Sequence, residues 1–193
     1  MTGKKQEKFE LILEAALKVI AENGFHGSQI SKIAKEAGIA DGTVYLYFKN
    51  KEDILISLFQ QRLGELVSTF NDSIRETNSA EEALRKICEI HFTELEQNVN
   101  LAFVTQIELR QSSFELRKAI GLSVKPYIQL IEHILEQGVQ EKSFRPDLDI
   151  KLTRLLLFGG MDEVVTSWLI SGRKYSLSAQ VDKTIEFFLK GLK

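Results

Sequence analysis

Residues 28–47 read SQISKIAKEAGIADGTVYLY, and this stretch decides how the amino end of the chain folds. A short amphipathic segment at residues 29–36 is followed by a turn at Gly38 and a second short segment at residues 41–47. Ser28 suits the N-cap of the first segment, because its hydroxyl can accept a bond from a free backbone N–H. Two short helices joined by a glycine-bearing turn have the spacing of a helix-turn-helix, whose second helix enters the major groove of DNA.

The second segment begins with slim residues and continues with outward-facing aromatics. Gly42 permits close approach of the backbone to a phosphate, and Thr43 offers a hydroxyl and a methyl group. The pattern turns Tyr45 and Tyr47 outward, where their hydroxyls can donate to phosphate oxygens. Lys51 adds a positive charge in the first turn of the next helix, where free N–H groups favour an anion. A small helical corner with two half-exposed tyrosines is the alternative interpretation.

The rest of the sequence predicts an all-α fold. It is rich in Leu, Ile, Glu, Lys and Ala, contains only two prolines, and has no segment that alternates with period two. We expect a three-helix helix-turn-helix domain at residues 1–51 and a second helical domain at residues 52–193. Apolar residues at helical spacing predict helices over residues 6–23, 51–78, 79–97, 101–111, 114–140, 150–170 and 177–192.

Composition places mild limits on partners and location. The net charge is −2, with eight lysines against six acids in residues 1–51, a balance of +2 that leaves −4 for the remainder. This asymmetry permits a nucleic-acid partner without requiring one. The single Cys88 excludes an internal disulfide and fits a reducing cytoplasm. The start MTGKKQEKFE lacks an apolar signal core, and no run of eighteen apolar residues occurs, so we expect a soluble cytoplasmic protein.

The motifs of common enzymes are missing from the sequence. It contains no G-x-S-x-G, no phosphate-binding glycine loop and no H-E-x-x-H. His26, His91 and His133 lack metal-ligand spacing, and the adjacent Asp162 and Glu163 point in different directions on a helix. We therefore expect no catalysis, no metal and no cofactor. A helical adaptor that binds only protein would leave the outward tyrosines unexplained.

The first third of the chain resembles the N-terminal domain of the TetR family of transcriptional regulators. ALKVIAENGFHGSQISKIAKEAGIADGTVYLYFKNKEDIL, within residues 9–59, carries the family's NGF, G-[hydrophobic]-x-x-G-T-[hydrophobic]-Y-x-[YH]-F and K-x-K-E-x-L patterns. The resemblance implies a homodimeric repressor of double-stranded operator DNA. Many members have Thr-Val or Thr-Thr at Gln29-Ile30, and Gln29 can pair bidentately with adenine, so this departure concerns the operator sequence. The implied DNA contacts are Ser28, Gln29, Gly42, Thr43, Tyr45, Tyr47 and Lys51.

The second domain resembles the fatty-acid-degradation repressors of Bacillus and its relatives, the FadR type within TetR. TQIELRQSSFELR and GGMDEVVTSW, together with the segments around them, carry this likeness. It implies a long-chain acyl-CoA as effector, with an apolar tunnel for the chain and arginines for the phosphates. Ordinary core packing of the aromatics, and pairing of the cations with Glu108 or Glu115, are the alternatives. The expected ligand contacts are Phe92, Phe103, Gln106, Arg110, Arg117, Phe158, Met161 and Trp168.

The last two predicted helices have the features of a dimer interface. Leucines and a glycine pair crowd one side of residues 150–170, and aromatics add apolar area on the final helix. A self-complementary patch of this kind suits a two-fold axis. The expected interface residues are Leu155, Leu156, Gly159, Gly160, Phe187 and Phe188.

A repressor of an efflux or other operon that responds to a different hydrophobic molecule is the alternative to the acyl-CoA hypothesis.

Overall fold

The structure, a computed structural model, describes residues 3–193. Every regular element within this range is a helix, which confirms the all-α prediction. The helices are α1 (Gly3–Gly27), α2 (Ile30–Glu36), α3 (Asp41–Val44), α4 (Lys51–Ile74), α5 (Ala80–Gln97), α6 (Val99–Glu108), α7 (Phe114–Gln140), α8 (Ile150–Ile170), the 3₁₀ turn η1 (Ser178–Gln180) and α9 (Val181–Leu192). No helix in the described part of the chain is long and apolar enough to cross a membrane.

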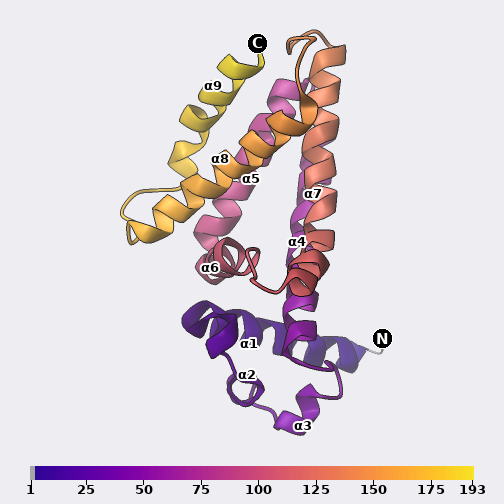
Figure 1. Cartoon of the computed structure of the whole chain (residues 1–193), viewed down its shortest axis with the longest axis vertical. Coiled ribbons are helices and arrows are strands. Elements are labelled where there is room, and N and C mark those ends of the chain that lie inside the picture. Colours follow the sequence, from indigo (N-terminus) through magenta and orange to yellow (C-terminus); the bar gives the residue numbers. More distant parts are fainter. Residues whose placement is uncertain (1–2) are drawn as a thin grey trace.

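The helices form a small head and a larger body (Figure 1). Helices α1, α2 and α3 make the head at the lower end of the picture, and α4 rises from it to lie beside α7 in the body. Helix α6 lies across the junction and packs on α1. The helix α4 and the α1–α6 contact are therefore the two physical connections between head and body.

A left-handed glycine ends the long part of α1. Gly24 has φ 67° and interrupts the helical backbone, as the Asn23-Gly24 pair predicts, because glycine adopts this conformation without a Cβ clash. Apolar residues at helical spacing in residues 6–23 predict one buried stripe on α1, and its members Ile12, Leu13, Ala16, Val19 and Ile20 are buried, while Phe9 is half-buried.

The start of α2 differs from the prediction. The N-cap is Gln29, which makes no side-chain cap bond, and the helix begins at Ile30. Ser28 is 1% exposed, and its hydroxyl donates to the carbonyl of Gly24 at 2.7 Å. The N-cap assignment to Ser28 is therefore wrong: its hydroxyl fastens the α1–α2 turn from inside.

Side-chain caps explain where several other helices start. The Asn50 side chain accepts the Asp53 N–H at 2.8 Å at the start of α4. Ser79 accepts the Glu82 N–H at 3.2 Å at the start of α5, as the spacing of Ser79 and Glu82 in the sequence predicts. Asn98 caps α6, so that helix begins two residues earlier than its apolar pattern indicates.

Helix ends are less accurately predicted than helix cores. The bounds of α7 and α8 are confirmed at both ends. The regular part of α3 stops at Val44, and turns continue through Tyr47. Helix α4 ends at Ile74, four residues before the predicted Asn78, and α6 ends at Glu108. The last helix begins at Val181, after the 3₁₀ turn.

A close contact at the far end of α7 gives a test of packing. A Cβ added to Gly138 would lie 2.1 Å from the ring of Phe144, which is buried, so Gly138→Ala forces the ring or backbone to move. We expect this variant to lose about 1–3 kcal/mol of unfolding free energy. Urea denaturation at fixed protein concentration measures the loss.

Gly64→Ala is the matched control. Gly64 lies in the exposed face of α4, and a Cβ there would meet nothing within 4 Å. Its replacement should raise stability by roughly 0.5–1 kcal/mol, because glycine loses more backbone entropy in a helix. Equal effects of the two variants would show that the Gly138–Phe144 contact is unimportant.

Candidate functional site

The surface around α3 presents an unusual set of exposed groups. Val44 and Phe48 are buried, and Tyr45 is 57% exposed, in agreement with the outward direction that the pattern predicts for it. Tyr47 is half-buried against the core of the head. Gly42 is exposed, with open space where a side chain would be. The start of α3 has no bulky side chain at Gly42, so it can approach a DNA groove, and the hydroxyls of Tyr45 and Tyr47 can donate to phosphates.

Lys51 is held in place by the end of α1. Its Nζ donates to the carbonyl of Phe25 at 2.7 Å and lies 4.4 Å from the centroid of the Phe25 ring. An ammonium has three N–H donors, so this bond leaves two for an anion near the first turn of α4. The side chain therefore has a fixed direction as well as a charge.

Two exposed residues near α3 are absent from the predicted set, and one predicted residue does not fit. Leu46 is 76% exposed and Lys49 is also exposed. An exposed leucine can contact a thymine methyl group, and a lysine can contact a phosphate. The burial of Ser28 keeps its hydroxyl away from any ligand, so the predicted DNA contact at Ser28 is not compatible with this geometry. Gln29 is exposed at the adjacent position.

Glu108 joins the body to the head. This side chain, at the end of α6, is 4% exposed, and its Oε1 accepts the N–H of Phe25 at 2.8 Å. The other carboxylate oxygen accepts a bond from the Gln111 side chain. Hydrogen bonds of this kind are what makes a buried carboxylate tolerable. The backbone of Phe25 is therefore bound from two sides: its N–H donates to Glu108 of α6, and its carbonyl accepts from Lys51 of α4.

A small cavity lies inside the body, among α4 to α8. Its volume is about 30 Å³, room for about one water molecule. Ligand pockets typically measure about 300–1,000 Å³, so this shape is closed to a long ligand. The predicted residues Gln106 and Phe158 contribute to the wall. The full lining is Arg62, Leu63, Leu66, His91, Leu95, Leu101, Thr105, Gln106, Leu109, Val124, Tyr127, Phe158 and Asp162.

An open groove of about 380 Å³ adjoins the cavity on the side of α6, α7 and α8. The predicted residues Arg110 and Arg117 line it. Arg110 pairs with the buried carboxylate of Asp162, and Arg117 donates to the carbonyl of Gln111 at 2.8 Å. Leu109, Val124, Phe158 and Asp162 line both hollows, so a ligand in the groove would lie against the cavity wall.

Four predicted ligand contacts line neither hollow. Phe92 and Met161 are buried in the core, and Phe103 is partly buried against it. The Trp168 ring N–H donates to the carbonyl of Tyr175 at 2.8 Å, which fixes the turn after α8. These four residues are packing residues in this structure, as the core-packing alternative states. The predicted set also missed His91, Tyr127 and Asp162, which come from three different helices.

His91 and Tyr127 form a buried polar pair in the cavity wall. The Tyr127 hydroxyl lies 3.2 Å from His91 Nδ1, and both side chains are buried. Burial lowers the pKa of His91 to about 4, although the nearby Asp162 opposes this shift. Burial also raises the pKa of Tyr127 well above its ordinary value. Both groups are therefore neutral at physiological pH.

Cys88, on the same helix as His91, is a further buried titratable group. Burial raises the pKa of the Cys88 thiol to about 12, which makes it a poor nucleophile. Within residues 3–193, no group of three or more His, Cys, Asp and Glu side chains could hold a metal ion.

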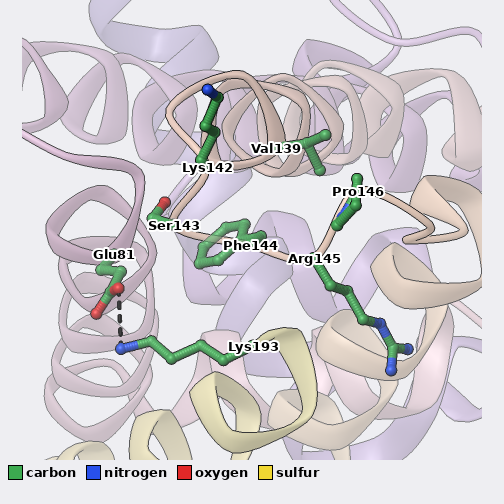
Figure 2. A pocket seen from close by; sticks show the side chains of 8 residues that line it. All are labelled: Glu81, Val139, Lys142, Ser143, Phe144, Arg145, Pro146 and Lys193. Atoms are coloured by element: carbon green, nitrogen blue, oxygen red, sulfur yellow. Dashed lines mark ion pairs between the residues drawn. The ribbon is translucent and has the colours of Figure 1, made fainter.

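A wider hollow of about 720 Å³ lies at the end of the body far from the head. Figure 2 shows that its charged groups do not converge: Lys193 pairs with Glu81, while the Lys142 amine and the Arg145 guanidinium point away in different directions. Without convergent polar groups this hollow lacks the features of a binding site.

One face of α8 and α9 exposes large apolar side chains. Leu155, Leu156 and Phe187 are exposed, and Gly159 has open space around it. The companion glycine has a different use: a Cβ on Gly160 would lie 2.8 Å from the Phe188 ring, so Gly160 makes room for α9 of the same chain. Exposed apolar area of this kind marks an interaction surface.

Comparison with known families matches both parts of the chain. Residues 12–58 match the family of bacterial regulatory proteins called the tetR family, and residues 59–191 match the C-terminal region of YsiA-like proteins. The chain belongs to the TetR family. The groups exposed around α3 thus lie in the family's helix-turn-helix segment.

Several relatives resemble the chain over nearly its whole length. The fatty acid metabolism regulator protein of Bacillus subtilis is 46% identical over 188 residues, which are 97% of either chain. The crystal structure of the FadR regulator of B. subtilis in complex with stearoyl-CoA has a TM-score of 0.93 and covers 96% of this chain and all of that one. The fatty acid degradation regulator FadR of Bacillus halodurans has a TM-score of 0.92 at 45% identity, with the same coverage.

The buried imidazole predicts a pH dependence of stability. The pKa of His91 is about 4 in the folded protein and 6.5 ordinarily, so unfolding takes up a proton between these pH values. Above about pH 6.5 the imidazole is neutral in both the folded and the unfolded chain, and His91 does not lower the stability. As the pH falls below this value, protonation of the unfolded chain lowers the free energy of unfolding by up to about 1.4 kcal/mol per pH unit. Unfolding free energy should therefore drop more steeply between about pH 7 and about pH 5 in the wild type than in His91→Leu.

His133→Leu is the control for this experiment, because His133 is exposed on α7. It should keep the wild-type slope of unfolding free energy against pH. Parallel curves for the wild type and His91→Leu would mean that His91 has no depressed pKa.

Proposed function

We propose that this chain is a DNA-binding transcriptional repressor of fatty acid degradation genes that long-chain acyl-CoA releases from its operator. The observation that carries the proposal is the placement of Arg110 and Arg117 in a groove directly beside an otherwise largely apolar cavity. Guanidinium groups suit the phosphates of CoA, and an apolar cavity suits the acyl chain. The 46% identical FadR of B. subtilis has been crystallised with stearoyl-CoA, which supports this assignment.

The head supplies the DNA contacts in this proposal. We assign it residues 1–51 and assign effector binding and dimerisation to residues 52–193. The exposed Leu155, Leu156 and Phe187, with Gly159 between them, would form the centre of the dimer contact. A two-fold dimer would place two heads on half-sites about 34–36 Å apart, or a multiple of that spacing. The proposed DNA contacts are Gln29, Gly42, Thr43, Tyr45, Tyr47 and Lys51.

Opening of the cavity is the proposed switch. An acyl chain cannot enter a space of about 30 Å³, so binding requires the helices around the cavity to separate. Burial of each CH₂ gains about 0.8 kcal/mol, and a shift from 1:99 to 99:1 needs about 5.5 kcal/mol of differential binding. Helix α6 forms one wall and holds Phe25 through Glu108, so its displacement would move or release the end of α1.

Other features fit a regulator without catalytic activity. His26 and His133 are exposed on different helices, and His91 is paired with Tyr127. A protein of this kind would work in the cytoplasm, where both operator DNA and acyl-CoA occur. The repressor would need no cofactor besides its effector.

The direct test is release of operator DNA by acyl-CoA. In a fluorescence-anisotropy titration, saturating palmitoyl-CoA or oleoyl-CoA should weaken operator binding at least tenfold, the equivalent of about 1.4 kcal/mol of coupling. CoA without an acyl chain should release little, because it cannot open the apolar cavity. A panel of amphipathic drugs run in parallel covers the efflux-type alternative.

Arg117→Ala should raise the acyl-CoA concentration needed for release, while Lys125→Ala, an exposed cation further along α7, serves as the matched control. Unchanged operator affinity with saturating acyl-CoA would contradict the effector assignment. Release of the operator by a drug, but not by acyl-CoA, would favour the efflux-type alternative instead.

The proposed contact of Lys51 with the DNA backbone gives a second prediction. Lys51→Met, alone or with Tyr47→Phe, should weaken binding to any duplex and lower the slope of log affinity against log salt by about 1 for the lost lysine. Lys151→Met, at the exposed start of α8, is the control and should change neither quantity. A wild-type affinity and salt slope in the Lys51→Met/Tyr47→Phe variant would remove this corner from the DNA interface.

A further inference from the structure

The polar pair in the cavity wall leaves one hydrogen-bonding atom without a partner. His91 is 5% exposed, and its Nε2 is buried with no hydrogen-bond partner in the described part of the chain. An unsatisfied buried polar group is costly, and native proteins rarely keep one without a use. The atom belongs to a residue that lines the cavity, so a molecule with a hydrogen-bond acceptor that enters the cavity can give it a partner.

The contacts of Tyr127 favour one tautomer of the His91 imidazole. The Tyr127 hydroxyl has His91 Nδ1 as its single hydrogen-bond partner within residues 3–193, and a hydroxyl has one proton to donate. Donation to Nδ1 satisfies the hydroxyl and places the imidazole proton on Nε2. The orphan atom is therefore an N–H donor, and its natural partner is an uncharged oxygen acceptor.

The rest of the wall indicates what that acceptor is. The cavity is mainly apolar, and its polar members are Arg62, His91, Thr105, Gln106, Tyr127 and Asp162, of which Asp162 also lines the groove. Arg62 pairs with Glu14 and Glu65 through its terminal nitrogens, while its Nε is a second buried donor without a partner among the described residues, and the Thr105 hydroxyl donates to the carbonyl of Leu101 at 2.9 Å. Gln106 already accepts a bond from Thr166 at 2.8 Å, and Asp162 is occupied by Arg110. An acyl-CoA that enters from the arginine-lined groove has two amide carbonyls along its pantetheine arm, and its thioester carbonyl is the one directly attached to the hydrocarbon chain.

We propose that His91 Nε2–H, oriented by Tyr127, donates to the thioester carbonyl of the bound acyl-CoA and so lets the protein distinguish a thioester from other long-chain CoA derivatives. This inference rests on the proposed function and adds a specificity-determining residue to it. The acyl chain would then lie in the opened cavity beyond His91, with the CoA part toward Arg110 and Arg117. The orphan donor of the closed state becomes satisfied in the liganded state, which favours that state.

The test compares palmitoyl-CoA with S-hexadecyl-CoA, a thioether that differs by replacement of the carbonyl with CH₂. In isothermal titration calorimetry, the wild type should bind the thioester roughly tenfold more tightly, the effect of about one hydrogen bond. The preference should disappear in His91→Leu/Tyr127→Phe, where both members of the pair are apolar, and persist in the His133→Leu control. His91→Gln, which keeps a side-chain N–H donor, should restore part of it.

The ratio of the two affinities is the decisive readout, because a variant that merely loosens the cavity weakens both ligands alike. Nitrogen-15 NMR of the wild-type imidazole should show the Nε2–H tautomer, with an Nε2 shift change on adding the thioester but not the thioether. Equal wild-type affinities, or a preference that survives in the double variant but vanishes in Gln106→Leu, would overturn the inference and leave the proposed function intact. Failure of both ligands to bind would overturn both.

Discussion

The hydrogen bond from the Phe25 N–H to the buried Glu108 carboxylate is the interaction on which the account depends. Phe25 follows the left-handed Gly24 at the end of α1, and its carbonyl accepts Lys51 from the first turn of α4. The backbone of Phe25 therefore connects α6, which forms one wall of the cavity, to Lys51, which is proposed to contact the DNA backbone. A buried carboxylate that loses its donors is strongly penalised, so α6 and the end of α1 are expected to move together.

Much of the head could be predicted from the sequence, because its structure follows from local rules. The NG pair ends the long part of α1, and the spacing of Val44 and Phe48 turns Tyr45 outward. The same rule could have drawn attention to Leu46, which lies between the two tyrosines and is exposed. Ser28 was misjudged because a hydroxyl before a helix can cap it or bond backward, and only the packing of α2 on α1 decides between these.

The cavity could be predicted only in part, because its wall comes from helices far apart in the chain. Arg110 and Arg117 were identified through the family resemblance, because one follows the end of α6 and the other lies on α7. His91, Tyr127 and Asp162 meet only through the packing of α5, α7 and α8. Large aromatics were a misleading signal: Phe92 and Trp168 fill the core instead of the cavity. Gly160 was likewise assigned to a partner helix, although Phe188 of the same chain occupies the space above it.

Thermodynamic linkage tests the central claim that one conformational equilibrium serves both sites. Calorimetry can compare the palmitoyl-CoA affinity of the free protein with that of its operator complex. The account predicts weaker binding to the complex, by the same factor by which palmitoyl-CoA weakens operator binding, and a smaller factor in Glu108→Ala. Equal palmitoyl-CoA affinity for the free and operator-bound protein would show that the two sites are independent, and would contradict the account.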